Sequence, residues 1–444
     1  MAKFKVADFN NKHFLALAGN LVTAVMAIVL MGLLTRSLSM ADMGAWFYFM
    51  MICGLGDAAR NGLLGTATIK FYAGAAPERA REVLGSVWFL AVALSGILML
   101  ADLAFMPFIG TVSSSLLVTS IRWFGVTFLS SLPFNVILWI LVADEQYGKV
   151  LWLRLINSGG MIVYAAVLIL LRKMTLEAML WGNFITFCIA SAVGILWGLG
   201  KVGSFFHRSW HCVKEIIRYG KYTMGTTFIS RLFGSADTNI IPFLLGPAAL
   251  AIYSVALNIM QGVEIILRTF IGTGMSGMAI AYNNNDEHQA AYIMKKYSGM
   301  LTLAFIPMAL VGFAFSGVAI DILGGHKYMG TEAANILRIF LFISILYPVD
   351  RFIGATLDII HKPVINLYKV IIMLVFAVAG DFIFISVFKN LYGVALATFC
   401  TTVAGILYGY THLNKYLKVS LGDIFALGWG EMKLFMQKMA GKMR

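Results

Sequence analysis

The chain has 444 residues, of which 60% are hydrophobic and 12% charged, and its mean hydropathy is +0.84. Soluble domains are nearer half apolar and a quarter charged, so this composition indicates a membrane protein and excludes a soluble enzyme or nucleic-acid binder. In a membrane protein, the formal net charge of +13 is explained by the basic bias of cytoplasmic loops.

Apolar runs along the chain predict an all-α polytopic membrane protein with about twelve transmembrane helices, because about 20 apolar residues cross a bilayer. The first six predicted spans are 13–35, 43–66, 83–104, 116–142, 150–171 and 178–199. The second six are 219–245, 250–282, 297–319, 333–359, 364–388 and 391–410. The first span is too long for a cleavable signal peptide and leads directly into the second.

Basic residues between the spans predict the orientation. Most of them fall on the side of the N-terminus, whereas the other side has only Arg36, Arg172, Lys173, Lys327 and Lys389. By the positive-inside rule, we expect both termini in the cytoplasm. We divide the chain into a first six-helix lobe (1–200), a basic cytoplasmic linker (201–216), a second six-helix lobe (217–415) and a cytoplasmic tail (416–444).

The tail is predicted to form an amphipathic helix on the inner leaflet, where it would anchor the chain. Its apolar residues recur at helical spacing and basic residues lie beyond that face: Leu421, Phe425, Trp429, Met432, Met436 and Met439, with Lys433, Lys438, Lys442 and Arg444.

The two lobes resemble each other in sequence. Residues 37–66 align with 244–273 without a gap, so that Asp57 falls on Glu264. The segments GILWG (194–198) and GILYG (405–409) also correspond. Each lobe has an even number of spans, so we predict a parallel duplication, with two pseudo-symmetric lobes around a central cavity.

Charged residues inside the spans point to the polar path, because a charge in hydrocarbon costs several kcal/mol and normally faces a bundle interior or water. Asp57 and Arg60 lie one turn apart in the second span, and Glu264 and Arg268 one turn apart in the eighth. Each pair has two interpretations. It either neutralises itself to permit burial or lines an inward-facing cavity.

The seventh span adds Arg231, Asp237 and Asn239 near mid-membrane. Guanidinium groups hold phosphate oxygens through bidentate, charge-assisted hydrogen bonds, so these arginines suit an anionic phosphate ligand. Five further basic residues lie nearer span ends, where they are expected to reach the headgroups: Arg122, Arg338, Arg154, Arg351 and Lys369.

Motifs for other functions are absent from the sequence. It contains no GxxxxGK[ST] nucleotide-binding loop, and its short outward loops leave little room for an external catalytic region. Its four cysteines show neither disulfide-framework nor metal-site spacing. We therefore expect no enzymatic activity, no cofactor and no metal site.

Four segments resemble the polysaccharide transporter (Wzx-type) flippases of the multidrug/oligosaccharidyl-lipid/polysaccharide exporter superfamily. They are RYGKY at 218–222, DTN at 237–239, LGPAALAIYSVA at 245–256 and LTRSLSMADMGAW at 34–46. Members of that family translocate undecaprenyl-pyrophosphate-linked oligosaccharide repeat units across the bacterial inner membrane by alternating access. Their products are used for O-antigen, capsule or exopolysaccharide synthesis.

The resemblance implies roles for particular residues and a set of partners. Arg60, Arg231, Arg268 and Asn239 would bind substrate. Apart from the resemblance, carboxylates at transport depth make Asp57, Asp237 and Glu264 candidates for coupling to protons or sodium ions. The implied partners are the lipid-linked oligosaccharide, membrane lipids, a polysaccharide polymerase and a chain-length regulator, with no nucleic acid.

Two alternatives remain open. One is an ion-coupled multidrug exporter of the same superfamily, in which Asp57, Asp237 or Glu264 would be the coupling site. The other is a membrane-embedded enzyme or a scaffold for a polysaccharide assembly complex.

Overall fold

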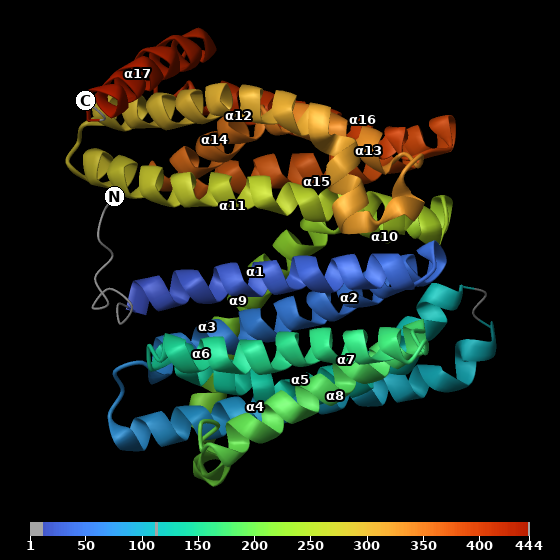
Figure 1. The fold of residues 1–444 in the computed structure, drawn as a ribbon. Coiled ribbons are helices and arrows are strands. Elements are labelled where there is room, and N and C mark those ends of the chain that lie inside the picture. Colours follow the sequence, from blue (N-terminus) through green and yellow to red (C-terminus); the bar gives the residue numbers. More distant parts are fainter. Residues whose placement is uncertain (1–11, 112–113, 443–444) are drawn as a thin grey trace. The chain divides into compact units, whose positions relative to one another are not determined.

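The computed structural model describes residues 12–111 and 114–442, and its described residues fold into helices joined by short connections (Figure 1). Within this part of the chain, nine helices are long and apolar enough to cross a membrane. The prediction of an all-α polytopic membrane protein is confirmed. By their chain contacts, the helices form two compact units, residues 1–235 and 236–444, which we call unit 1 and unit 2.

Unit 1 contains nine α-helices and four short helical segments among its described residues. They are α1 (Lys12–Ser37), α2 (Met40–Arg60), the π-helical η2 (Asn61–Gly65), α3 (Thr66–Tyr72), α4 (Pro77–Phe105), η3 (Met106–Thr111), α5 (Ser115–Ala143), α6 (Tyr147–Arg154), the π-helical η4 (Leu155–Gly159), α7 (Gly160–Leu170), α8 (Leu176–Leu196), η5 (Val202–His207) and α9 (Trp210–Gly234).

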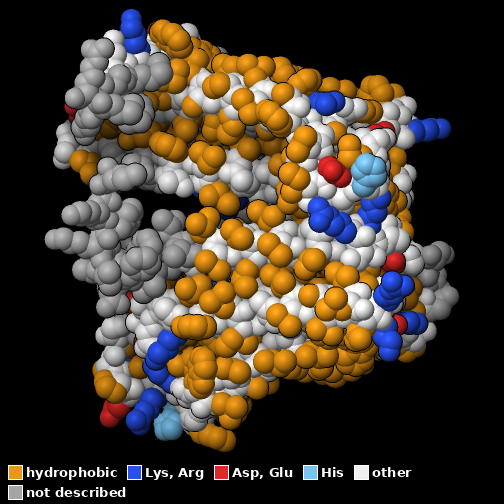
Figure 2. All heavy atoms as spheres, in the orientation of Figure 1, with side chains coloured by type: hydrophobic (Ala, Val, Ile, Leu, Met, Phe, Trp, Pro, Cys, Tyr) orange, Lys and Arg blue, Asp and Glu red, His pale blue; other side chains and the backbone are white. Residues whose placement is uncertain are grey.

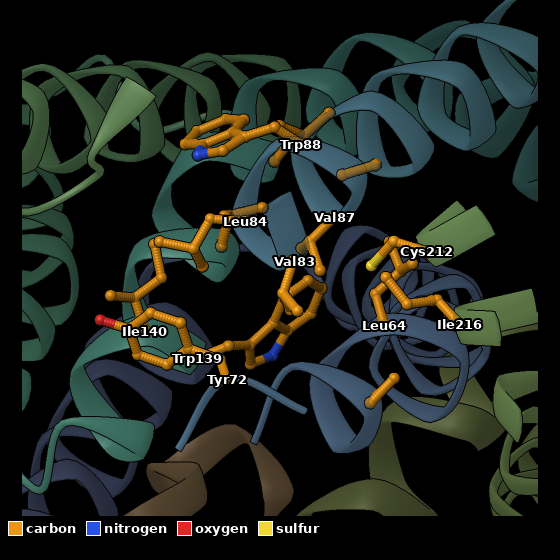
Figure 3. Packing of buried hydrophobic residues seen from close by; sticks show 14 residues of the cluster. Leu64, Tyr72, Val83, Leu84, Val87, Trp88, Trp139, Ile140, Cys212 and Ile216 are labelled. Carbon is orange, nitrogen blue, oxygen red and sulfur yellow. The ribbon is translucent and has the colours of Figure 1, made fainter. Parts of the chain in front are cut away.

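The core of unit 1 lies where α3, α4, α5 and α9 meet. Trp88 and Leu84 of α4, Trp139 of α5 and Cys212 of α9 are buried there around Leu64 of η2 (Figure 3). Interlocking apolar side chains of this kind hold membrane helices together mainly by close packing, since lipid tails are as apolar as they are.

Unit 2 contains eight α-helices and one 3₁₀ segment in the part that the structure describes. They are α10 (Ala236–Leu244), α11 (Pro247–Asn283), α12 (Glu287–Gly324), η6 (His326–Tyr328), α13 (Ala333–Ser344), α14 (Tyr347–Ile359), α15 (Pro363–Phe388), α16 (Tyr392–Leu413) and α17 (Leu421–Lys442). The hairpin of α15 and α16 is closely packed, because at Gly393 an added Cβ would lie 2.7 Å from the Phe384 backbone.

On the face shown in Figure 2, hydrophobic side chains cover much of both units along the middle of the helices, and Lys and Arg side chains gather toward the helix ends. This distribution is expected of helices that contact lipid along their length and water at their ends.

Four predicted spans are interrupted helices among the described residues. Span 43–66 continues from α2 into π-helical η2, span 150–171 runs from α6 through π-helical η4 into α7, span 219–245 breaks between α9 and α10 at Ser235, and span 333–359 breaks between α13 and α14. Charged or polar residues lie at these interruptions, for example Arg60 and Asn61 in span 43–66 and Ser235 and Asp237 in span 219–245. Broken helices at membrane depth occur where the freed backbone groups face protein or a polar cavity.

The packing boundary differs from the predicted linker at 201–216. Helix α9 begins at Trp210 and packs against α2, η2 and α4, so it lies in unit 1. At Gly62, an added Cβ would lie 2.7 Å from the Met224 backbone, which shows how closely α9 approaches η2. The division of the chain into two lobes at the linker remains a prediction.

The tail forms α17, which packs on α12. At Gly428, an added Cβ would lie 2.5 Å from the backbone of Gly299. Glu431 accepts a hydrogen bond from Tyr292 (2.6 Å) and pairs with Lys296, and Lys295 pairs with Asp423 at 3.3 Å. Some tail residues lie outside the described side chains, namely Arg444, Leu421, Met436, Met439, Lys438 and Lys442.

Candidate functional site

Arg60 in unit 1 is sealed inside the protein, with 1% of its side chain exposed. Its guanidinium donates to the Asp57 carboxylate, to the Phe128 carbonyl (2.9 Å) and to the Ser131 hydroxyl (2.8 Å), and it lies 4.1 Å from the centre of the Phe128 ring. These contacts satisfy Nη1 and Nη2 of the buried cation, whereas its Nε has no hydrogen-bond partner among the described residues. The structure therefore places Arg60 behind Asp57 and away from any open surface.

Asp57 and Arg231 occupy the open side of the same group. The Asp57 side chain is 44% exposed, and Arg231 of α9 is also exposed. Arg231 lies against α2, because a Cβ added at Gly54 would be 2.8 Å from its Nη2 atom, and its charge acts on the Asp57 carboxylate. One carboxylate thus lies between two guanidinium groups, which leaves a net positive charge.

Unit 2 has a second carboxylate between two arginines. Glu264 of α11 lies 3.5 Å from Nε of Arg268, one turn further along the helix, and 3.5 Å from Nη2 of Arg351 on α14. The Arg268 side chain is 78% exposed and that of Arg351 is 45% exposed. Both guanidinium groups keep N–H donors for an anionic ligand, because only one nitrogen of each approaches Glu264.

Arg351 was predicted only to reach the headgroups from a span end. Its contact with Glu264 needs α14 to pack against α11, so the residue spacing alone does not reveal it. The signal in the sequence is its position directly beside Asp350 within the predicted span 333–359.

Asp237 forms a separate acidic site in unit 2. Its carboxylate accepts a hydrogen bond from the Tyr253 hydroxyl, and the Asp381 carboxyl group of α15 lies near enough for the two carboxyl groups to interact electrostatically. Asp381 is fully buried, and neither of its oxygens has a hydrogen-bond partner among the described residues. Two neighbouring carboxylates repel each other, so this pair favours holding one proton or another cation.

Asn239 lies two residues after Asp237 on α10 and is partly buried. Asn239 has an interaction partner in the structure.

A further buried ion pair joins α14 to α15. The ammonium group of Lys369 lies 2.6 Å from Oδ1 of Asp350 and donates to the Asp350 carbonyl at 2.8 Å, and each side chain is 4% exposed. Lys369 therefore does not reach the headgroups as expected of a residue near a span end. Its dry surroundings indicate a packing role.

The predicted site residues thus gather into three groups. Unit 1 brings together Arg60, Asp57 and Arg231, and unit 2 brings Arg268 to Glu264 and, separately, places Asp237 beside Tyr253 and Asp381. In the described part of the chain, no cluster of three or more His, Cys, Asp or Glu residues has a geometry that would hold a metal ion.

A family model described as polysaccharide biosynthesis protein matches residues 33–332, which is more than half of the chain. No curated protein matches the sequence.

Solved structures of low sequence identity share the fold. The chain is similar to the lipid II flippase MurJ in an inward closed conformation, with a TM-score of 0.73, 16% identity, and coverage of 96% of this chain and 93% of that one. It is also similar to an inward-facing multidrug resistance MATE transporter of the MOP superfamily, with a TM-score of 0.71, 16% identity, and coverage of 88% and 95%.

A third similar structure is a MOP superfamily transporter from Pyrococcus furiosus with a binding pocket of reversed polarity. Its TM-score is 0.54 at 16% identity, with coverage of 89% of this chain and 95% of that one. These likenesses show that the chain has the fold shared by MurJ and the MATE transporters.

Proposed function

The chain belongs to the polysaccharide biosynthesis protein family, and from this premise we propose that it flips lipid-linked oligosaccharides. The substrate would be an undecaprenyl-pyrophosphate-linked repeat unit for O-antigen, capsule or exopolysaccharide synthesis. The membrane would be the bacterial inner membrane, with both termini cytoplasmic and with a polysaccharide polymerase and a chain-length regulator as partners. The similar solved structures are a flippase and transporters, which agrees with a function other than catalysis.

One observation carries the choice of an anionic substrate. In each unit a single carboxylate lies between two arginines: Asp57 with Arg60 and Arg231, and Glu264 with Arg268 and Arg351. Each group therefore has a net positive charge, and Arg231, Arg268 and Arg351 are open to a ligand. Bidentate guanidinium donors suit the oxygens of a diphosphate.

A polar path is needed because moving a diphosphate and its sugars through hydrocarbon leaves each charge and hydroxyl uncompensated. In the proposed alternating-access cycle, the arginine groups replace the water lost by the diphosphate and open first to the inner and then to the outer leaflet.

We assign cation coupling to Asp237, with Asp57 and Glu264 as further candidates. Asp237 is favoured because Asp381 beside it is buried without a hydrogen-bond donor among the described residues, whereas Asp57 and Glu264 are each paired with arginine. Loss of a proton from the two carboxyl groups would leave two adjacent carboxylates, which favours either another cation or a rearrangement of α10 against α15.

A multidrug exporter is the second candidate, supported by the fold shared with MATE transporters. Such a protein exports organic cations and would use Asp237 as a coupling site. The arginine groups argue against it, because exposed guanidinium groups repel a cationic drug.

The test is complementation of a strain that lacks its oligosaccharide flippase. We expect the wild-type gene to restore surface glycan, and we expect Arg231→Ala, Arg268→Ala and Asp381→Asn to fail at normal protein levels. Arg172→Ala, at an exposed position after α7, is the matched control and should complement. Restored glycan in all three variants would overturn the assignment. Drug resistance on overexpression that is lost in Asp237→Asn would instead support the exporter.

A further inference from the structure

A cavity of about 650 Å³ lies in unit 1 where α4 begins and η5 precedes α9. Its lining combines cationic, hydroxyl and aromatic side chains: Arg81, Lys201, His207, Ser204 and Tyr72. Lys and Arg side chains, with a histidine, also gather on the surface over this end of α4 and the segment before α9 (Figure 2). None of these residues belongs to the arginine and carboxylate groups described above.

The wall of the cavity is fixed by close packing on α4. A Cβ at Gly85 would lie 2.3 Å from the Ser204 carbonyl, so only glycine lets η5 approach this closely. The Trp88 indole donates to the Gly200 carbonyl at 2.9 Å, and the Ser209 hydroxyl bonds to Glu82. Glu82 in turn accepts from Arg79 at 2.7 Å. The cavity is therefore a built feature and not a gap beside a loose loop.

The charges in the cavity leave cations for a ligand. Lys201 lies 3.0 Å from Asp144 and bonds to the Tyr72 hydroxyl. Burial alone would lower the Lys201 pKa, but these two partners raise it above its ordinary value, so the ammonium is charged at neutral pH. Arg81 and His207 form no ion pair within the described part of the chain. Arg81 is also exposed. A phosphate group complements this lining.

The surroundings place the cavity at the membrane surface. Candidate spans end at Leu196 and begin at Pro77 on either side of it. Phe206 is 84% exposed and Trp210 is 68% exposed, and Val202 is exposed as well. Exposed aromatic residues beside span ends are typical of the headgroup region, where apolar rings contact acyl chains and cations contact phosphate.

We propose that this cavity binds the phosphate headgroup of an anionic phospholipid, with the exposed Phe206 and Trp210 beside its acyl chains. A soluble phosphate would present the same phosphate oxygens to the cavity. The exposed apolar residues at its rim favour a lipid as the source of the phosphate group. This inference does not depend on the proposed transport function.

The test is native mass spectrometry of the purified full-length protein titrated with phosphatidylglycerol or with phosphatidylcholine. We expect tighter binding of phosphatidylglycerol and a roughly fivefold loss in Arg81→Gln, which removes one charge near the headgroup. Arg172→Gln is the control. It removes another exposed charge, in the loop before the start of α8, whereas the cavity lies beyond the end of α8, so the affinity should not change. Equal affinity for both lipids, or equal losses in the two variants, would overturn the proposal.

A second variant tests the cavity itself without changing charge. Gly203 lines the cavity and a Cβ there meets open space, so Gly203→Leu would fill it. We expect the preference for phosphatidylglycerol to disappear in this variant and to persist in Gly96→Leu, where α4 also faces open space. Unchanged preference in Gly203→Leu would contradict the site. Displacement of phosphatidylglycerol by millimolar pyrophosphate would show a soluble-phosphate site and overturn the lipid assignment.

Discussion

Arg60 bonds to Asp57 from the packed interior of unit 1, so the arginine is almost fully buried while its carboxylate partner remains 44% exposed. The two arginines that act on Asp57 therefore have different roles. Arg60 orients the carboxylate through contacts with α5, and Arg231 is available to a ligand.

We predict that Arg60→Ala lowers the stability of unit 1 by about 2–3 kcal/mol, since it removes the buried hydrogen bonds to the Phe128 carbonyl and the Ser131 hydroxyl together with the ion pair to Asp57. Arg231→Ala should change stability by less than about 0.5 kcal/mol, as expected of an exposed residue. Unfolding of both purified variants in detergent, followed by tryptophan fluorescence, compares them. Equal losses would contradict this division of roles.

The sequence predicted the helices well and the burial of individual charges poorly. Apolar runs determine where helices form, because in lipid the backbone must satisfy its own hydrogen bonds. The position of Arg60 depends on Phe128 and Ser131 of α5, which are distant in sequence, and periodicity within α2 does not reveal them.

The same limit explains the missed site residues. Asp381 lies in a predicted span whose neighbours are apolar, and its meaning appears only when α15 brings it to Asp237 on α10. Its presence as a lone carboxylate in that span was the available signal. The predicted repeat aligns Asp57 with Glu264, and in each unit the structure pairs that acid with an arginine one turn further along the helix.

Arg351 should matter to the substrate as much as Arg268 does, because both approach Glu264 at the same distance of 3.5 Å. We predict that Arg351→Ala weakens binding of the lipid-linked oligosaccharide by about tenfold, the effect of one lost charge-assisted hydrogen bond. Arg338→Ala is the control, since Arg338 bonds to Asn335 and to the Phe313 carbonyl and lies outside the Glu264 group. An affinity as high as that of the wild type in Arg351→Ala would remove this residue from the site.

The buried Lys369 and Asp350 pair should behave as a structural element. Lys369→Met leaves the Asp350 carboxylate buried without its partner, and we expect a loss of about 3–4 kcal/mol. The double variant Lys369→Met with Asp350→Leu removes both charges and should recover most of that loss. Thermal unfolding of the three variants measures the coupling. A double variant no more stable than Lys369→Met would argue against this explanation.

Helix α17 should depend on its glycine contact with α12. Gly428→Leu overpacks the contact with Gly299, and a cost of 1–3 kcal/mol is typical of overpacking. We predict that trypsin cleaves the 414–420 segment about tenfold faster, because its rate follows the open population. At Gly430 on the same helix a side chain meets open space, so Gly430→Leu should be cleaved at the wild-type rate. Equal cleavage rates for Gly428→Leu and the wild type would show that the packing of α17 on α12 does not depend on the Gly428 contact.

In the proposed function, the arginine groups of the two units carry a lipid-linked anionic glycan across the membrane. The most direct measurement reconstitutes the purified protein in proteoliposomes that contain a fluorescent lipid-linked oligosaccharide, and follows its accessibility to an external quencher. We predict rapid translocation by the wild type, and a loss of at least about tenfold in the Arg231→Ala and Arg268→Ala double variant at equal reconstitution. Translocation by that variant at the wild-type rate would contradict the account.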